Sequence, residues 1–415
     1  MLSLCELAVD IVTEHLLPLL HISDLVTLAT TCRHLHLLCN DDRLWRYRTT
    51  MDLSLNTSGL EPCQGWKETY KKIVDHSVVY VWGENYDKRL GIDDNDSQSF
   101  DKVVTPTKHT GFVGKGIIQI VAGGWSFHAL DYQGRVWMWG LMQPRNPLGG
   151  VDEATSGIVH LPSNIRIRAL ASGRSHAVAL DESGRVWHWS NRWQPMLVKN
   201  LGFAPIVQIT ACVHHSIALS ATGDLYIISY PIINSTIHVH QIPIPLLHHD
   251  DRIIQIAGMD SAILVLTALG RLFRVSTLGN HVQELLDFSN ILNGNHQLSV
   301  TAHHHHFAIV DHTENKIILT NQTHGQPLQQ FHMDTLVNKI VLGKNHMGVL
   351  TVDGTLLTGS LLQDATTAIL PLLGRQHTDT NEAFAAVDLD TTMHVFTAGF
   401  GGEHSACLAL PRDIF

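Results

Sequence analysis

Apolar residues three and four positions apart dominate the first fifty residues, and this spacing predicts short amphipathic helices. The regular spacing breaks near Pro18. A second helix is expected from Ser23, which is placed to cap it, with Asp24 in its first turn. Asn40 or Asp41 is placed to cap a last turn. The apolar positions of these helices are Leu7, Ile11, Leu16 and Leu20, then Leu25, Leu28, Cys32 and Leu35, and finally Leu44 and Trp45.

A helical unit this small cannot bury all of these side chains by itself. The pattern leaves two explanations open. The helices cap the domain that follows, or they form a docking module whose apolar face is covered by another protein.

From residue 78 onward the pattern changes to a repeat of short alternating strands. Its clearest copy is GRSHAVALDESGRVWHWS (173–190), with a Gly, a His three residues later, an apolar run ending in Leu, a turn Gly and an alternating strand. Ser126 replaces the His in one copy, and others lack a Gly. The further copies lie at 343–360, 123–140, 212–229, 258–276 and 303–320, and a truncated one begins at 401–408.

Each copy predicts a β-hairpin, in which the apolar run and the alternating segment are strands joined by a tight turn. The turn Gly supplies the positive φ that other residues resist. Another apolar strand precedes most copies, as in IIQIVA (117–122), IVQITA (206–211) and IIQIAG (253–258). The turns recur every 39–50 residues, which suits one four-stranded propeller blade per repeat.

The two ends of the repeat region complement each other. GGEHSACL (401–408) starts a seventh hairpin without a returning strand, whereas VVYVWG (78–83) is a returning strand without a start. Joining them completes seven blades and leaves no exposed sheet edge. We therefore predict a mainly β fold, a seven-bladed β-propeller closed by strands from both ends of the repeat region and preceded by a small all-α module.

Composition and charge narrow the classes of partner. The chain is 44% hydrophobic and 16% charged, as expected of a globular protein, and its net charge is −10 without a Lys/Arg-rich run. Nucleic acid and membrane binding are therefore not expected. Glu6, Asp10 and Glu14 stand where a secretory signal would be basic and apolar, and the six cysteines show no CxxC spacing. We expect a cytoplasmic or nuclear location, or both.

The stretch ELAVDIVTEHLLPLLHISDLVTLATTCRHLHLLCNDDRLW (6–45) resembles an F-box, and GWKETYKK (65–72) resembles the stretch that often follows one. The matching pairs are Glu6-Leu7, Ile11-Val12, Asp24-Leu25, Cys32-Arg33 and Leu44-Trp45, while Ser3-Leu4 replaces the usual Leu-Pro. The resemblance implies binding to a Skp-type adaptor and, through it, to a cullin/RING ubiquitin ligase. It implies that apolar contacts to the adaptor come from Leu7, Ile11, Leu25, Leu28, Cys32 and Leu44, with Trp45 as a candidate anchor, while some of these side chains must instead hold the three helices together.

The strand repeat is similar to that of the regulator of chromosome condensation family, over residues 78–410. The shared features are Gly-x-x-His-x-x-x-Leu, a turn Gly and a Trp-Gly end to the blade strand. The order of the two parts resembles that of fungal F-box proteins with such repeats. The expected domains are residues 1–50 for the F-box-like module, 51–77 for a linker with a connecting helix, and 78–415 for the propeller.

Several conspicuous residues are assigned structural roles. In the run His303–His306, alternation along a strand would point adjacent imidazoles to opposite faces, so no metal site is predicted. The Pro- and polar-rich insertions at 84–110, 141–164 and 230–252 are candidate binding surfaces. The repeat histidines (His176, His215, His306, His346 and His404) are expected to bond within their own blades, and the strand tryptophans (Trp82, Trp137, Trp139, Trp187 and Trp189) to pack between blades.

These expectations combine into one function, with no cofactor, no catalytic residue and no enzymatic activity of its own. The F-box-like module would dock to the adaptor, and the propeller would hold an unidentified protein substrate for ubiquitination and proteasomal degradation. The alternatives are a guanine-nucleotide exchange factor for a small GTPase, an activity known in the repeat family, and a propeller scaffold without a ligase.

Overall fold

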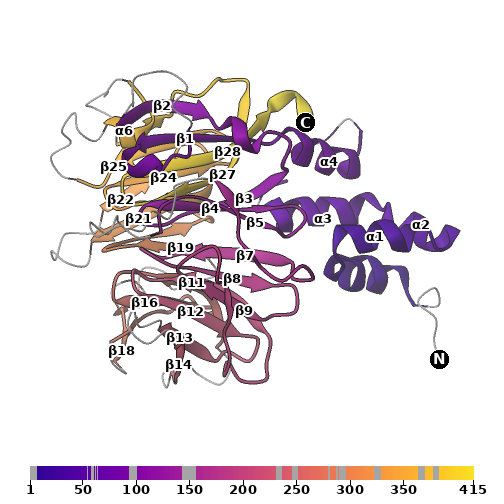
Figure 1. Ribbon diagram of the computed structural model, residues 1–415, viewed down its shortest axis with the longest axis horizontal. Helices are drawn as coiled ribbons and strands as arrows, with labels where there is room; N and C mark the ends of the chain where they lie inside the picture. The colour runs from indigo at the N-terminus through magenta and orange to yellow at the C-terminus, as the bar shows by residue number, and fades with distance from the viewer. Residues whose placement is uncertain are drawn as a thin grey trace.

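The structure is a computed structural model of the chain. It describes residues 7–53, 55–57, 60, 62, 64–92, 101–142, 156–229, 236–244, 251–278, 281–286, 288, 296–321, 329–362, 370–376 and 383–415. Helices lie at one side of a large β-structure, and the C-terminus returns to the same side (Figure 1). No helix within these ranges is long and apolar enough to cross a bilayer.

The N-terminal region is helical, as its apolar spacing predicts. His21, and not Ser23, caps helix α1, because its Nδ1 accepts a hydrogen bond from the Ser23 amide. The helical segments are a π-helical turn at Ile11–Leu16, a 3-10 turn at Leu17–Leu19, α1 (Ile22–Ala29), α2 (Arg33–Cys39), α3 (Asp42–Leu53) and α4 (Trp66–His76).

Seven four-stranded antiparallel sheets follow, and they confirm the predicted propeller. The first three blades are β3 (Ile117–Ala122), β4 (Ser126–Asp131), β5 (Val136–Gly140) and β6 (Gly157–Ile158); β7 (Ile167–Ser172), β8 (Ala177–Asp181), β9 (Val186–Trp189) and β10 (Met196–Leu197); and β11 (Ile206–Ala211), β12 (His215–Ser220), β13 (Leu225–Ser229) and β14 (His238–Ile242).

The remaining blades continue the same order, inner strand first. Blades four to six are β15 (Ile253–Gly258), β16 (Ala262–Thr267), β17 (Leu272–Ser276) and β18 (Val282–Glu284); β19 (Leu298–His303), β20 (His306–Asp311), β21 (Lys316–Asn321) and β22 (Gln329–His332); and β23 (Val337–Leu342), β24 (His346–Thr351), β25 (Leu356–Ser360) and β26 (Ala385–Ala386). The short helix α6 is Leu370–Leu373.

The seventh blade joins the two ends of the repeat region, as predicted. Its order is β27 (Met393–Phe400), β28 (His404–Pro411), β1 (Val78–Glu84) and β2 (Lys102–Lys108). The seven inner strands contact one another in a closed ring, with β27 against β3. Because every blade has two neighbours, the inner part of the sheets has no open end.

The Gly-x-x-His spacing has a steric cause at this ring. A Cβ on Gly173 would lie 2.2 Å from Cε1 of His176 and 2.6 Å from the Cys212 carbonyl oxygen of the next blade. A Cβ on Gly343 would lie 2.5 Å from Cε1 of His346. Only glycine leaves room for both the imidazole and the neighbouring backbone.

His346 and His404 serve the seams between blades, which corrects for these two residues the expectation that the repeat histidines bond within their own blades. His346 Nε2 lies 2.7 Å from Ser405 Oγ in the seventh blade. His404 Nε2 lies 3.4 Å from the Ser126 carbonyl oxygen in the first blade. The recurring Gly-x-x-His spacing at these two positions therefore reflects contact with the next blade.

The hairpin turns of the first and second blades depend on a buried aspartate. Asp181 Oδ1 accepts from the amides of Ser183 and Arg185, each at 2.9 Å. Its Oδ2 accepts from Arg185 Nε at 2.8 Å and from Trp187 Nε1 at 3.0 Å. Asp131 makes the equivalent bonds in the first blade. Trp137 and Trp187 therefore bond to their own turns, whereas Trp82, Trp139 and Trp189 are buried in the cores.

Glutamines on inner strands join neighbouring blades. Gln255 Nε2 donates to the Val300 carbonyl at 2.8 Å, and its Oε1 accepts from the Val300 amide at 2.9 Å. Gln119 pairs in the same way with the backbone of Leu170. The sequence signal was visible, since Gln occupies the same place in the three apolar strands at 117–122, 206–211 and 253–258.

The insertions expected to carry a binding surface contain the outermost strands β2, β6 and β14. Parts of these insertions (93–100, 143–155, 230–235 and 245–250) lie outside the described residues. The described parts of these insertions therefore include the outer strands of blades as well as connecting loops.

Candidate adaptor-docking face and axial pocket

The helical module has a small core of its own. Leu25 and Leu44, each 1% exposed, lie at its centre, and Leu7 and Leu28 pack partly buried against it. Leu25 and Leu44 are therefore among the residues that hold the helices together, and neither offers an exposed surface to an adaptor in this structure. The buried members are Val12, Leu17, Leu25, Leu35, Leu38, Cys39 and Leu44.

Trp45 is not an exposed anchor either. It is 4% exposed, its Nε1 donates to the Cys39 carbonyl at 2.8 Å, and its ring meets Tyr70 edge-on at 5.3 Å between centroids. Trp45 lies in α3, and Tyr70 belongs to the next helix, α4. The tryptophan therefore connects the module to the helix that leads into the propeller.

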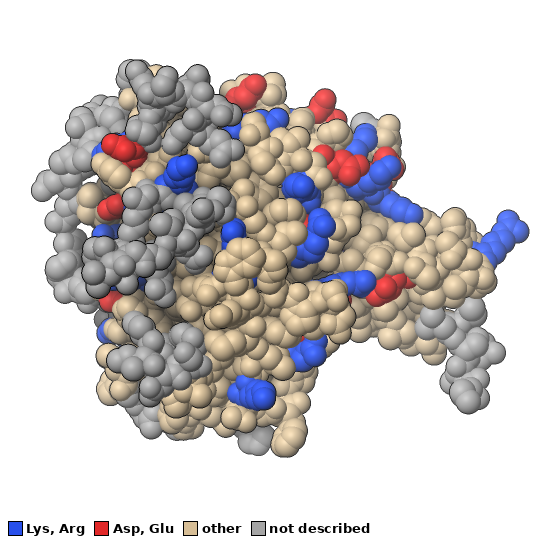
Figure 2. Space-filling model, in the orientation of Figure 1, with Lys and Arg blue, Asp and Glu red and all other residues tan. Residues whose placement is uncertain are grey.

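Other apolar side chains of the module face solvent. Of the predicted contact residues, Ile11 is 46% exposed and Cys32 is exposed, although the Cys32 sulfur also caps α2 by accepting from the Leu35 amide. Sequence analysis missed the exposed Val9, Leu19, Val26 and Leu37, which are 41–80% exposed. On the side seen in Figure 2, the projecting helices carry few charged side chains.

A polar network fixes the helices relative to one another. Arg48 Nη1 donates to the carbonyls of Pro18 and Leu20, at 3.1 and 2.6 Å. Its Nη2 lies 2.8 Å from Asp52 Oδ2, which also accepts from the Tyr70 hydroxyl at 3.1 Å. Burial raises the pKa of Asp52 and, together with the Asp52 charge, raises the pKa of Tyr70 well above its usual value. The network therefore joins α3 to α4.

A pocket lies on the propeller axis, at the end remote from the helices. β1 begins at Val78 directly after α4, and its far residue Gly83 pairs with His404. Gly402 and Glu403, which precede His404, line a cavity of about 220 Å³. Every blade contributes to its wall through the loop after its inner strand. The helical module and this pocket therefore occupy opposite ends of the propeller.

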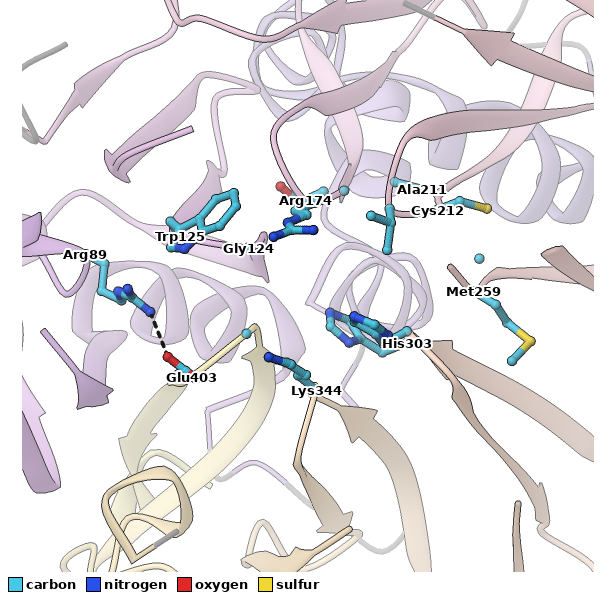
Figure 3. A pocket seen from close by; sticks show the side chains of 16 residues that line it. Arg89, Gly124, Trp125, Arg174, Ala211, Cys212, Met259, His303, Lys344 and Glu403 are labelled. Atoms are coloured by element: carbon cyan, nitrogen blue, oxygen red, sulfur yellow. Dashed lines mark ion pairs between the residues drawn. The ribbon is translucent and has the colours of Figure 1, made fainter. Parts of the chain in front are cut away.

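Charged and aromatic side chains converge in this pocket (Figure 3). The Arg174 guanidinium lies 5.0 Å from the centre of the Trp125 ring. Arg89 Nη1 lies 3.7 Å from Glu403 Oε2, and Lys344 extends from the sixth blade. Trp125, Arg174, Lys344 and Glu403 stand one or two places after a repeat Gly, so ring closure brings them together, whereas Arg89 follows the 3-10 turn at Tyr86–Lys88.

The histidine run lies at the wall of this pocket. His304 has a φ of 55°, which breaks the strand between β19 and β20 and turns its ring to within 4.2 Å of the His305 ring centroid. The expected alternation of adjacent imidazoles is therefore wrong at these two residues. Their ring nitrogens and a carboxylate oxygen of Asp260 lie within 4.8 Å of one another.

Comparison with family models identifies both parts of the chain. A model described as F-box-like matches residues 6–50, and two models of the regulator of chromosome condensation (RCC1) repeat match residues 77–130 and 167–191. The F-box-like match covers the helical module and the repeat matches fall on blades of the propeller.

Relatives and solved structures agree with the repeat assignment. The chain is 24% identical to protein pim1 of Schizosaccharomyces pombe over 36% of its own length and 33% of that protein. It is 28% identical to human E3 ubiquitin-protein ligase HERC2 over 36% of its length, but over only 3% of that protein. It thus spans a third or less of these relatives.

Two solved propellers share the fold. Prp20p from Saccharomyces cerevisiae has a TM-score of 0.63 at 16% identity, over 84% of this chain and 96% of that one. Human WBSCR16 has a TM-score of 0.64 at 16% identity, over 81% of this chain and 99% of that one. The chain carries an F-box-like domain at residues 6–50 and a seven-bladed propeller in which residues 77–130 and 167–191 match the regulator of chromosome condensation repeat.

Proposed function

We propose that this chain is the substrate-recognition subunit of an SCF-type ubiquitin ligase. The F-box-like module docks to a Skp-type adaptor that leads to a cullin/RING ligase, and the propeller binds a protein substrate for ubiquitination and degradation. The chain needs no catalytic residue of its own for this role, since holding a substrate near the activated ubiquitin raises its effective concentration.

The observation that carries the proposal is the set of exposed apolar side chains on a module whose own core is already filled. Leu19, Val26 and Leu37 are 80%, 53% and 64% exposed, although Leu25 and Leu44 beside them are buried. Such side chains gain about 25 cal/mol for each Å² of apolar surface that a partner covers. The F-box-like match over the same residues supports a Skp-type adaptor as that partner.

A pull-down with a purified Skp-type adaptor tests the proposal on the full chain. The variant Val26→Asp/Leu37→Asp places two charges on the exposed face without entering the module's core. Leu278→Asp, at an 81% exposed position on the propeller, is the matched control. Leu25→Asp is unsuitable, because a charge at that buried position would unfold the module.

The wild type and the Leu278→Asp control are expected to bind the adaptor with one-to-one stoichiometry. The double variant is expected to lose at least about 30-fold in affinity, because two charges must be desolvated in an apolar interface. Circular dichroism should show unchanged folding. A wild-type chain that does not bind the adaptor would refute the proposal.

A second candidate is nucleotide exchange on a small GTPase. The observation in its favour is the similarity of the propeller to Prp20p, whose solved structure is described with its binding to Gsp1p and histones. The net charge of −10 and the F-box-like module are not features that this role requires. A fluorescent-nucleotide release assay separates the two functions, since a ligase subunit should leave the release rate unchanged.

A further inference from the structure

The axial pocket differs in charge from the chain that surrounds it. The whole chain has a net charge of −10. The pocket wall, however, contains Arg89, Arg174 and Lys344 against the single carboxylate of Glu403. A carboxylate oxygen of Asp260 lies within 4.8 Å of ring nitrogens of His304 and His305. The end of the propeller remote from the helices therefore concentrates positive charge on its axis.

Two of these cations are available to a ligand. Arg174 stacks over Trp125, and neither it nor Lys344 forms an ion pair with any carboxylate in the described part of the chain. Glu403 already faces Arg89 at 3.7 Å, and Arg89 Nε also donates to the Tyr86 carbonyl at 3.1 Å. Donor groups therefore exceed free acceptors, which favours a ligand that brings acceptor oxygens.

Two imidazoles in the pocket wall also favour a ligand that brings anionic oxygens. The Nδ1 atoms of His303 and His304 are buried and have no hydrogen-bond partner among the described residues. Burial lowers the pKa of His304, and the charges of His305, Lys344 and Arg174 lower it further against the opposing effect of Asp260. Lys344 and Arg174 disfavour a proton on His304 because of their positive charge, and the same charge attracts an anion to this part of the pocket.

Hydrogen bonds between blades hold the backbone at the rim of the pocket, so the points from which the Arg174 and Lys344 side chains extend are fixed before a ligand arrives. The amide of Gly124 donates to the Arg174 carbonyl at 3.1 Å, and the Arg174 amide donates to the Val213 carbonyl at 3.1 Å. The Lys344 amide donates to the Gly401 carbonyl at 3.0 Å. A cavity of about 220 Å³ holds one extended side chain, whereas a folded domain could only cover its mouth.

We propose that the axial pocket binds an anionic side chain, a carboxylate or a phosphoryl group, carried by an extended segment of the protein substrate. Arg174 and Lys344 contact the anionic oxygens, and Trp125 covers one side of the bound group. The inference rests on the proposed function for the identity of the ligand as a protein substrate, and it defines the chemistry by which that substrate is recognised.

Fluorescence anisotropy on the full chain tests this inference. The probes are three fluorescein-labelled nonapeptide pools with degenerate neutral flanks around a central serine, glutamate or phosphoserine. The variants are Arg174→Gln and Lys344→Gln. The control is Lys199→Gln, which removes the same charge from an exposed position beyond the outer strand β10.

The glutamate or the phosphoserine pool is expected to bind at least about tenfold more tightly than the serine pool, and each pocket variant to lose about tenfold. Binding by the phosphoserine pool alone identifies a phosphoryl group as the ligand, and binding by both pools identifies an anion in general. The Lys199→Gln control should change affinity less than twofold.

Equal binding by all three pools, or an equal loss in the Lys199→Gln control, overturns the inference. Binding of free inorganic phosphate without binding of any peptide pool also overturns it, because the pocket would then be an anion site that recognises no peptide. The adaptor pull-down is independent of these measurements. A chain that binds the adaptor but no acidic peptide refutes the pocket assignment alone, and the reverse result refutes the ligase role alone.

Discussion

Acidification from pH 7.5 to 5.5 should destabilise the propeller by at least about 4 kcal/mol, the contribution of three histidines buried at the seams between blades. His128, His346 and His404 are completely buried, and burial lowers the pKa of each to about 3 from an ordinary value of 6.5. Each ring also bonds to the neighbouring blade, as His128 Nδ1 does with Ser172 Oγ at 3.0 Å and His346 Nε2 with Ser405 Oγ at 2.7 Å.

The sign of the effect follows from the direction of these pKa shifts. Between pH 6.5 and 3 the unfolded chain binds protons that the folded chain does not, so stability is complete above the unfolded pKa and falls as the pH drops. At pH 5.5 the loss for each histidine is RT ln(1 + 10), or about 1.4 kcal/mol. Three histidines give about 4 kcal/mol, a large part of the roughly 5–15 kcal/mol that stabilises a typical protein.

Urea unfolding followed by tryptophan fluorescence at pH 7.5, 6.5 and 5.5 measures this loss. His346→Gln keeps a group that can hydrogen-bond to Ser405 but cannot titrate, so its loss between pH 7.5 and 5.5 should be about 1.4 kcal/mol smaller than that of the wild type. His34→Gln, at an exposed position on α2, is the control. A wild-type chain that is equally stable at pH 7.5 and 5.5, or a His346→Gln variant with an undiminished loss, would refute the reasoning.

Three substitutions probe the remaining features of the repeat, each by urea unfolding at pH 7.5. Asp181→Ala removes the acceptor of four hydrogen bonds and leaves buried donors without partners, so a loss of about 3–5 kcal/mol is expected, with a smaller loss for Asp181→Asn. Gly343→Ala forces a Cβ against His346 and should cost more than Gly114→Ala, where nothing lies within 4 Å and only the φ of 70° opposes the change. Gln255→Leu breaks both bonds to the next blade and should cost about 2–4 kcal/mol; an unchanged stability would show that these bonds contribute nothing.

The propeller was predictable because its signals are local and recur. A turn glycine, an apolar alternation and a fixed Gly-to-His spacing each reflect contacts within one hairpin or with an identical neighbour. The outer strands were not visible in this way. β6, β10 and β26 have two residues each and are half exposed, so they carry no apolar run to mark them.

The docking face was predictable only in part, because helical spacing shows which residues share a face but not what covers that face. Trp45 and Leu44 were assigned to an adaptor, yet Tyr70 covers the first and the module's core encloses the second. Val26 and Leu37 are exposed and lie outside the regular apolar series, so the spacing did not indicate them as contact residues.

The axial pocket, in contrast, contains a signal that sequence reasoning could have used. Ring closure brings equivalent positions of all repeats to one axis, so the residues that follow each repeat Gly must meet. Arg174 and Lys344 directly follow the repeat glycines Gly173 and Gly343, whereas Trp125 and Glu403 stand two places after Gly123 and Gly401. These two adjacent columns of the repeat predict, without any coordinates, that the four side chains meet on the axis.

The helical module and the propeller share one apolar core, and this core would fix how the proposed receptor presents its substrate. Leu53 and Leu55 are buried, and they belong to the same apolar cluster as Tyr70, Ile73 and the strands of the first blade. The described residues of the segment that leads from the module into the propeller therefore contribute to the core, and the Arg48 network further fixes α3 and α4. Because the pocket opens at the opposite end, a bound substrate would be held at a distance set by the propeller itself. A substitution that loosens this core should therefore slow the transfer of ubiquitin to the substrate, while adaptor binding and substrate binding stay unchanged.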